Sequence, residues 1–222
     1  MKRNMKELHI KKLKLQEDIE PEQIPGLFEK EQITYQPADT VNWQEYPYRP
    51  EMKFAIAHAG DRILLHYHIT EQSVRAVAPA DNGRVWEDAC AEFFIQPEEG
   101  EKVYYNFECN CAGTLLIEFG PAGNRTHAPS TTLESVKRWA SLGREPFDEK
   151  AGLCTWDLTL IIPVSAFFRH RIENLDGKEM RANFYKCGDL LQTPHFLSWN
   201  PIDLPKPCFH CPDFFGRIYF DK

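Results

Sequence analysis

Apolar and polar residues alternate with a period of two along most of this chain, in segments of β-strand length. Residues 53–58 and 62–69 are two such segments, and the turn at Gly60-Asp61 between them predicts a β-hairpin. Further strand-like segments follow at 72–78, 89–96, 103–110, 114–119, 133–140, 154–162, 181–187, 196–199 and 214–220. About ten short strands with turn residues between them predict an all-β fold, an antiparallel β-sandwich of the immunoglobulin or jelly-roll kind with little helix.

The first part of the chain lacks this regular pattern. Five prolines interrupt residues 1–50, at Pro21, Pro25, Pro37, Pro47 and Pro50. We therefore expect residues 1–34 to form an irregular leader and residues 35–222 to form a single β-sandwich domain. No internal repeat or linker indicates a second domain.

Charge and hydropathy exclude several classes of protein. The 222 residues include 26 basic and 33 acidic ones, a net charge of −7, which argues against a nucleic-acid partner because phosphate binding needs a basic surface. The apolar segments are too short to span a membrane. The N-terminus has charges but no apolar run typical of a secretory signal, so we expect a soluble, cytoplasmic chain. If an export signal had been removed, the expected location would be periplasmic or extracellular.

Alternation assigns the residues of each predicted strand to two faces. One face is apolar, as in Phe93 and Phe107, whereas the other collects polar groups. The second face holds His66, His68, Glu92, Asn106, Glu108, Arg181, Asn183 and Tyr185. A solvated sheet face is one explanation, but it would favour flexible Lys, Glu and Thr side chains. The mixture of Asn, Arg, Glu and Tyr near Trp instead indicates a small-molecule site.

Two tryptophans lie in polar loops at strand ends, Trp86 in residues 83–88 and Trp199 in residues 198–201. A tryptophan on the solvent side presents a flat apolar face that can stack on a sugar ring, while neighbouring carboxylates and amides bind the hydroxyls. The alternative is that each plugs the core beneath its loop. We expect that core role for Trp139 and Trp156, which lie inside strand patterns.

Two contiguous blocks resemble a known family. Residues 86–95 (WEDACAEFFI), followed by residues 104–110 (YYNFECN) and Gly113, are similar to blocks of the family 9 carbohydrate-binding modules and their DOMON-like relatives. Residues 181–189, 198–201 and 214–216 look like the branch of family-9-like proteins that is often labelled endoxylanase. The resemblance covers residues 35–222.

The resemblance implies a β-sandwich that often binds calcium and clamps a terminal sugar between two tryptophans. Trp86 matches the tryptophan before the EFFI strand, Glu92 matches the acidic residue six positions later, and Trp199 is the candidate for the second tryptophan. Our face assignment adds Asn106, Glu108 and Arg181 as hydrogen-bonding residues. The expected function is non-catalytic carbohydrate binding, with a carbohydrate ligand as the partner.

Two other functions remain open at this stage. A glycoside hydrolase of the xylanase kind would use two carboxylates on either side of one bond, and Glu92 and Glu108 lie on neighbouring predicted strands. A haem-binding DOMON-like domain would use Met and His ligands, such as Met52 or Met180 with His66 or His68.

Metal ligands cannot be assigned from the sequence. Acidic segments at 81–83, 87–88 and 148–149 offer oxygen ligands for calcium, but the chain has no 12-residue calcium-loop pattern. Among the seven cysteines, Cys208 and Cys211 with His210 between them have the spacing of a zinc pair, but no second pair completes four ligands. We expect reduced thiols in a loop there.

Overall fold

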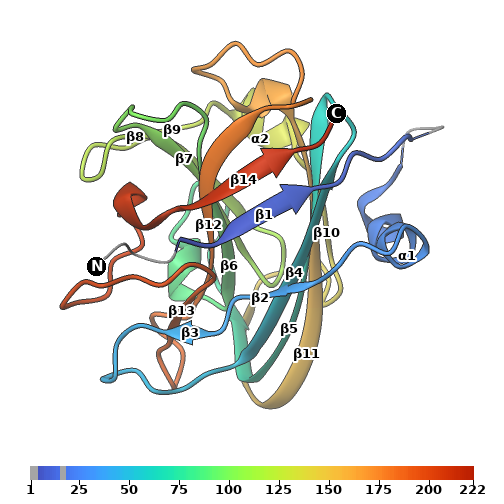
Figure 1. The fold of residues 1–222 in the computed structure, drawn as a ribbon. Helices are drawn as coiled ribbons and strands as arrows, with labels where there is room; N and C mark the ends of the chain where they lie inside the picture. Colours follow the sequence, from blue (N-terminus) through green and yellow to red (C-terminus); the bar gives the residue numbers. More distant parts are fainter. Residues whose placement is uncertain (1–4, 16–18) are drawn as a thin grey trace.

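The computed structural model describes residues 5–15 and 19–222, and two β-sheets packed face to face form its body (Figure 1). The first sheet has the order β1-β14-β12-β6-β7-β8-β9, with β13 also paired to β12 and β3 paired to β13. Its strands are β1 (Glu7–Ile10), β3 (Thr40–Val41), β6 (Cys90–Gln96), β7 (Tyr104–Asn110), β8 (Leu115–Gly120), β9 (Thr126–His127), β12 (Glu179–Cys187), β13 (Phe196–Ser198) and β14 (Gly216–Phe220).

The second sheet has the order β10-β11-β5-β4-β2. Its strands are β2 (Gln36–Pro37), β4 (Glu51–His58), β5 (Arg62–Ala76), β10 (Lys137–Ala140) and β11 (Phe147–Pro163). The helical segments are short: α1 (Ile24–Lys30), α2 (Ser130–Ser135) and the 3₁₀ turns η1 (Pro21–Gln23), η2 (Val85–Glu87), η3 (Val164–Ala166) and η4 (Pro212–Phe214). No helix in the described part of the chain is long and apolar enough to cross a membrane.

The predicted β-sandwich is confirmed, and so is the hairpin, which is formed by β4 and β5 with Phe54 opposite Tyr67. Two strand predictions differ from the structure. The segment at 72–78 is not a separate strand but falls largely within β5, which stays paired with β11 through two register shifts. The segment at 133–140 is divided into the end of α2 and the strand β10.

The N-terminal residues are part of the sandwich, in contrast to the irregular leader expected for residues 1–34. Strand β1 pairs in parallel with β14, and Figure 1 shows the two arrows side by side. Helix α1 buries Ile24 and Phe28 against Ala55 and Leu64 on the outer face of the second sheet. Residues 1–4 and 16–18 of the predicted leader lie outside the described residues. A strand of four residues and a helix of seven are too short to produce a clear periodic pattern.

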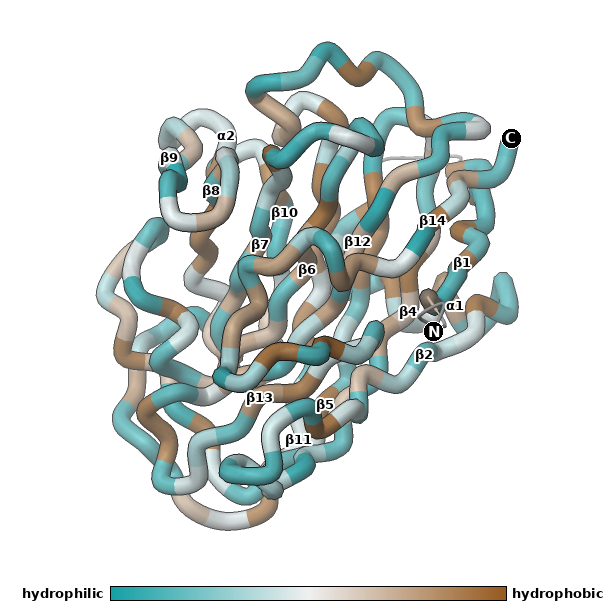
Figure 2. The backbone as a smooth tube through the Cα atoms, turned by 60° about the vertical axis from the view of Figure 1, so that its left-hand side comes forward, coloured by the Kyte–Doolittle hydropathy of each residue, from teal (hydrophilic) through white to brown (hydrophobic). Residues whose placement is uncertain are grey.

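The core lies between the inner faces of the two sheets, where aromatic rings meet. Phe184 stacks on Phe54 at 3.7 Å between ring centroids and on Phe93 at 5.0 Å. Trp156 is fully buried there, as predicted, whereas Trp139 on β10 is only half-buried. The hydrophobic colouring in Figure 2 runs along the central strands, whereas the outer loops are mainly hydrophilic.

Gly216, at the start of β14, lets the chain pass close to the core. A Cβ atom at this position would lie 2.5 Å from Cζ3 of Trp199 and 2.7 Å from the backbone oxygen of Lys6. We expect Gly216→Ala to lower the free energy of unfolding by about 1–3 kcal/mol, measured by urea denaturation, because a buried ring and β1 would both have to move. Gly26→Ala is the matched control, since outside its own helix and its chain neighbours no atom lies within 4 Å of the added methyl group. An equal, small effect of both substitutions would contradict this packing.

Candidate functional site

The polar outer face of the first sheet is buried, and not exposed to solvent. The segment that follows β13 folds back over this face and stacks Phe209 on Tyr185 at 4.1 Å between ring centroids. Beneath it, the exposed fractions of Glu92 and Glu108 are only 2% and 3%. Two carboxyl groups are therefore enclosed beside aromatic rings, as expected of a binding site rather than a solvated face.

A cavity of about 320 Å³ lies between this face and the covering segment. Strands β6, β7, β8 and β12 form its floor, and η2, β13 and the loop before η4 form its walls. The lining residues are Trp86, Glu92, Phe94, Glu108, Leu116, Glu118, Cys187, Asp189, Phe196, Pro207, Cys208, Phe209 and His210. The volume is at the lower end of the range for small-molecule sites.

Glu92 and Glu108 are directly opposite each other on β6 and β7. Asn106 fixes the orientation of Glu108, because its Nδ2 donates a 2.9 Å hydrogen bond to Glu108 Oε1 and a 3.2 Å bond to Glu118 Oε2. Arg125 in turn donates to Asn106 Oδ1 and lies over the ring of Tyr104. Hydrogen bonds from Asn106 thus hold Glu108 and Glu118 in place on the cavity floor.

Burial keeps these acids protonated to an unusually high pH. It raises the pKa of Glu108 to about 8 and that of Asp189 to about 6. The pKa of Glu92 is raised well above its usual value, first by burial and then by the neighbouring charge of Glu108. At neutral pH the carboxyl group of Glu108 is therefore mainly neutral and can both donate and accept hydrogen bonds.

The cavity wall is aromatic. Trp86 is half-buried on η2, whose position is held by a hydrogen bond from the backbone N–H of Asp189 to the carbonyl of Trp86. Burial, together with the charge of Arg125, lowers the pKa of His210 to about 4, so its imidazole is neutral. His210 Nδ1 lies 2.8 Å from the hydroxyl oxygen of Tyr104. This wall therefore offers flat aromatic rings, and the guanidinium group of Arg84 lies 5.7 Å from the ring centroid of Trp86.

The structure brings together three of the six predicted site residues. Trp86, Glu92 and Glu108 all line the cavity. Asn106 lies beside Glu108 on the same face of β7, where it is fully buried and bonded to Glu108 but does not line the cavity.

The other two predicted residues lie elsewhere. Trp199 is 2% exposed in the core between the sheets, with its ring edge-on to Phe184 at 5.7 Å, so it cannot close a sugar clamp at this cavity. Trp199 is three positions from Phe196, which lines the cavity, and residues three apart in extended chain point to opposite faces. Arg181 lies at the other end of β12, where its Nη2 donates to the carbonyl of Phe215 at 2.9 Å.

The residues considered for haem are not brought together. Met52 and Met180 are buried in the core between the sheets. His66 and His68 point from β5 to the outer face of the second sheet, where both lie near Asp157, with His68 Nδ1 2.7 Å from its Oδ1. The sequence had placed these histidines with the Glu92 face, but the two sets belong to different sheets.

Two of the acidic residues considered for calcium, Asp81 and Asp88, already accept hydrogen bonds from protein donors. The two oxygens of Asp81 each accept a 2.8 Å hydrogen bond from Arg138. Those of Asp88 accept the backbone N–H groups of Val77 and Ala78, both at 3.0 Å. These two carboxylates organise the ends of strands and do not fit a calcium site.

Sequence reasoning missed most of the cavity wall. Alternation could have predicted Cys187 and Asp189, because they continue the face of Tyr185 along the end of β12. No alternation in the sequence indicates that Phe196, Phe209 and His210 line the cavity. Their position at the cavity wall depends on how the segment after β13 folds back over the sheet.

The chain matches a family model and several solved structures. The family model for carbohydrate-binding family 9 matches residues 22–220. A crystal structure of a candidate carbohydrate-binding protein from Bacteroides uniformis ATCC 8492 has 57% sequence identity and a TM-score of 0.96, and the match covers 98% of this chain and 100% of that one. No curated protein matches the sequence.

Two more distant structures share the fold. Both are family 9 carbohydrate-binding modules from Caldicellulosiruptor kristjanssonii, each 10% identical to this chain. The complex with glucose has a TM-score of 0.58 and covers 97% of this chain and 96% of that one. The complex with cellotriose has a TM-score of 0.57 and covers 97% and 94%. The resemblance found in the sequence is confirmed, and the chain belongs to carbohydrate-binding family 9.

Proposed function

We propose that the cavity binds a sugar unit without catalysis, with the ring stacked on Trp86 and its hydroxyls bonded by Glu92 and Glu108. One observation carries this proposal. Two buried carboxyl groups and a half-buried tryptophan line the same small cavity. A sugar ring has an apolar C–H face and hydroxyls around its edge, and this cavity presents a complementary surface to each.

The raised pKa values of the two carboxyl groups suit this ligand. Each sugar hydroxyl is at once a donor and an acceptor, and a neutral carboxyl group can satisfy both roles. Asn106 contributes indirectly, because its bond to Glu108 leaves that side chain one preferred orientation. Membership in a carbohydrate-binding family supports the ligand class, and the glucose and cellotriose complexes of the distant neighbours suggest the first probes.

Trp86→Ala is expected to weaken sugar binding by about tenfold or more, because it removes the stacking surface. Isothermal titration calorimetry with glucose, cello-oligosaccharides and xylo-oligosaccharides measures this, with wild-type affinity expected in the micromolar to millimolar range. Trp139→Ala is the matched control, since Trp139 is also half-buried but lies on β10 of the second sheet. Equal losses in both variants, or no loss in Trp86→Ala, would contradict the proposed site.

Two further variants, Glu92→Gln and Glu108→Gln, test the hydrolase alternative. Glu92 and Glu108 face each other in one cavity, as a pair of catalytic carboxyl groups would. Release of reducing sugar by wild-type protein, abolished in both Glu92→Gln and Glu108→Gln, would replace binding with hydrolysis. Binding without release supports the proposal.

A further inference from the structure

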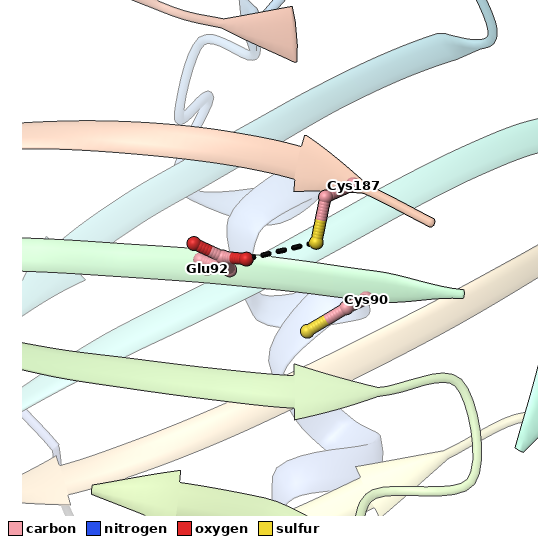
Figure 3. Close-up of side chains that lie close together, drawn as sticks. All are labelled: Cys90, Glu92 and Cys187. Atoms are coloured by element: carbon pink, nitrogen blue, oxygen red, sulfur yellow. Dashed lines mark hydrogen bonds between the residues drawn. The ribbon is translucent and has the colours of Figure 1, made fainter. Parts of the chain in front are cut away.

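Three potential metal ligands meet at the edge of the cavity, two of them lining it. The sulfur atoms of Cys90 and Cys187 and a carboxylate oxygen of Glu92 all lie within 4.8 Å of one another, and all three side chains are buried. Figure 3 shows them converging from two adjacent strands, with a 2.9 Å contact from Cys187 Sγ to Glu92 Oε1. The proposed sugar contacts do not require two thiols at this position.

The backbone explains why these groups converge. Cys90 and Glu92 are two residues apart on β6, so their side chains lie on the same face. Cys187 is directly opposite Cys90 on β12. A pair of alternate residues on one strand and a third residue across the ladder therefore form a triangle on one face of the sheet, held by the hydrogen bonds of both strands.

The surroundings favour a cation. Glu108 and Asp189 line the same cavity as Glu92 and Cys187. The neighbouring Lys186 points away, into the core, where its Nζ lies 2.9 Å from Glu71 Oε2. Carboxyl groups thus lie around the triangle, and the ammonium group of Lys186 is already paired with Glu71. A divalent ion there would replace protons on the ligands and bring positive charge to a buried acidic site.

We propose that Cys90, Glu92 and Cys187 bind a thiophilic divalent cation, with Zn²⁺ the best match, through two sulfurs and one carboxylate oxygen. Sulfur ligands select zinc over calcium and magnesium, which prefer oxygen. Glu92 and Cys187 also line the cavity, so an ion can reach the site and a fourth coordination position faces the cavity. Three protein ligands with one open position are typical of zinc sites that bind an exchangeable water or ligand.

A second group of thiols must be separated from this site in any experiment. Cys208 and His210 line the cavity wall, and Cys211 is close by, with its Sγ 3.1 Å from the backbone oxygen of Cys208. These residues have the spacing that had suggested a zinc pair in the sequence. They lie in the covering loop, whereas the proposed ligands lie on the sheet.

The test measures metal directly, without sugar. Reduced protein is stripped with a chelator and titrated with Zn²⁺ by calorimetry, and bound metal is counted by mass spectrometry after dialysis. We expect one Zn²⁺ per chain, and Co²⁺ in its place should give a sulfur-to-metal charge-transfer band. Cys90→Ser and Cys187→Ser should each weaken zinc binding by more than about tenfold and reduce that band. The double variant Cys208→Ser/Cys211→Ser is the matched control and should keep both.

Two results would overturn the proposal. One is the absence of stoichiometric zinc binding by the wild-type protein, and the other is loss of zinc only in the Cys208→Ser/Cys211→Ser variant. If a cysteine variant fails to fold, zinc binding is measured in Glu92→Gln instead. This variant should bind zinc more weakly but keep the charge-transfer band, because both thiols remain. Because no sugar is present, failure here would leave the proposed sugar binding standing, and the failure of sugar binding would leave this site standing.

Discussion

Replacing Lys186 with methionine is expected to lower the free energy of unfolding by about 3–5 kcal/mol. The Nζ atom of Lys186 lies 2.9 Å from Glu71 Oε2 and 2.9 Å from His195 Nε2, and these side chains are fully buried. Methionine has a similar length but no charge. The carboxylate of Glu71 would therefore remain between the two sheets without its cation.

The cluster around Lys186 joins the two sheets. Lys186 comes from β12 of the first sheet, whereas Glu71 comes from β5 of the second and also accepts a 2.7 Å hydrogen bond from Trp156 Nε1. Burial, with the charge of Lys186, holds the pKa of His195 well below its usual value. The neutral imidazole then accepts from Lys186 through Nε2, while its Nδ1 donates to the carbonyl of Thr193 at 3.0 Å.

A double variant separates loss of the ion pair from loss of packing. In Lys186→Met/Glu71→Gln both charges are absent, but the introduced amide keeps an oxygen that can accept from the indole N–H of Trp156. We expect this variant to recover at least half of the lost stability, measured by urea denaturation, since replacing both members of a buried pair costs much less than removing one. A loss below about 1 kcal/mol in the single variant, as for an exposed pair, would contradict this assignment.

Glu108→Gln is expected to change how stability depends on pH. The folded protein keeps the proton of Glu108 up to a pKa of about 8, whereas the unfolded chain releases it near 4.5. Between these values the native state binds one more proton than the unfolded state, so this residue makes wild-type stability fall as pH rises. Glutamine cannot titrate. The variant should therefore gain about 1.4 kcal/mol relative to wild type for each pH unit between about 5 and 8.

Urea denaturation of both proteins at closely spaced pH values measures this difference. Below pH 4.5 the two stability curves should run parallel, because both states of the wild-type protein then hold the proton. From about pH 5.5 to 7.5 the difference should grow by about 3 kcal/mol. Parallel curves over the whole range would show that Glu108 is ionised in the folded protein, and the proposed hydrogen bonding to sugar would then need acceptor contacts alone.

Much of the fold could be predicted from the sequence, because β-structure leaves a local signal. Alternation placed Phe93 and Phe107 in the core and Glu92, Asn106 and Glu108 on the opposite face, and each position agrees with the structure. Elements without a period were missed. Strand β1 has only four residues, and its partner β14 lies at the opposite end of the chain, so no local pattern could indicate the pairing.

The two loop tryptophans show where local patterns stop being informative. Trp86 and Trp199 both lie beside polar residues at strand ends, and the sequence gives them equal standing as sugar-stacking residues. In the structure Trp86 lines the cavity, whereas Trp199 is packed edge-on against Phe184. The difference depends on the direction in which the chain leaves β13, which is decided by packing against β12 and β14.

The sequence by itself determined the sandwich class, the two faces of the central strands and membership in carbohydrate-binding family 9, because alternation and contiguous motif blocks are properties of neighbouring residues. Only the tertiary structure decided that the polar face is enclosed and which groups share the enclosure. Glu92 meets Cys187, and Tyr185 is covered by Phe209, through contacts between distant segments. Burial by those segments is also what raises the pKa of Glu92 and Glu108, and no local pattern encodes it.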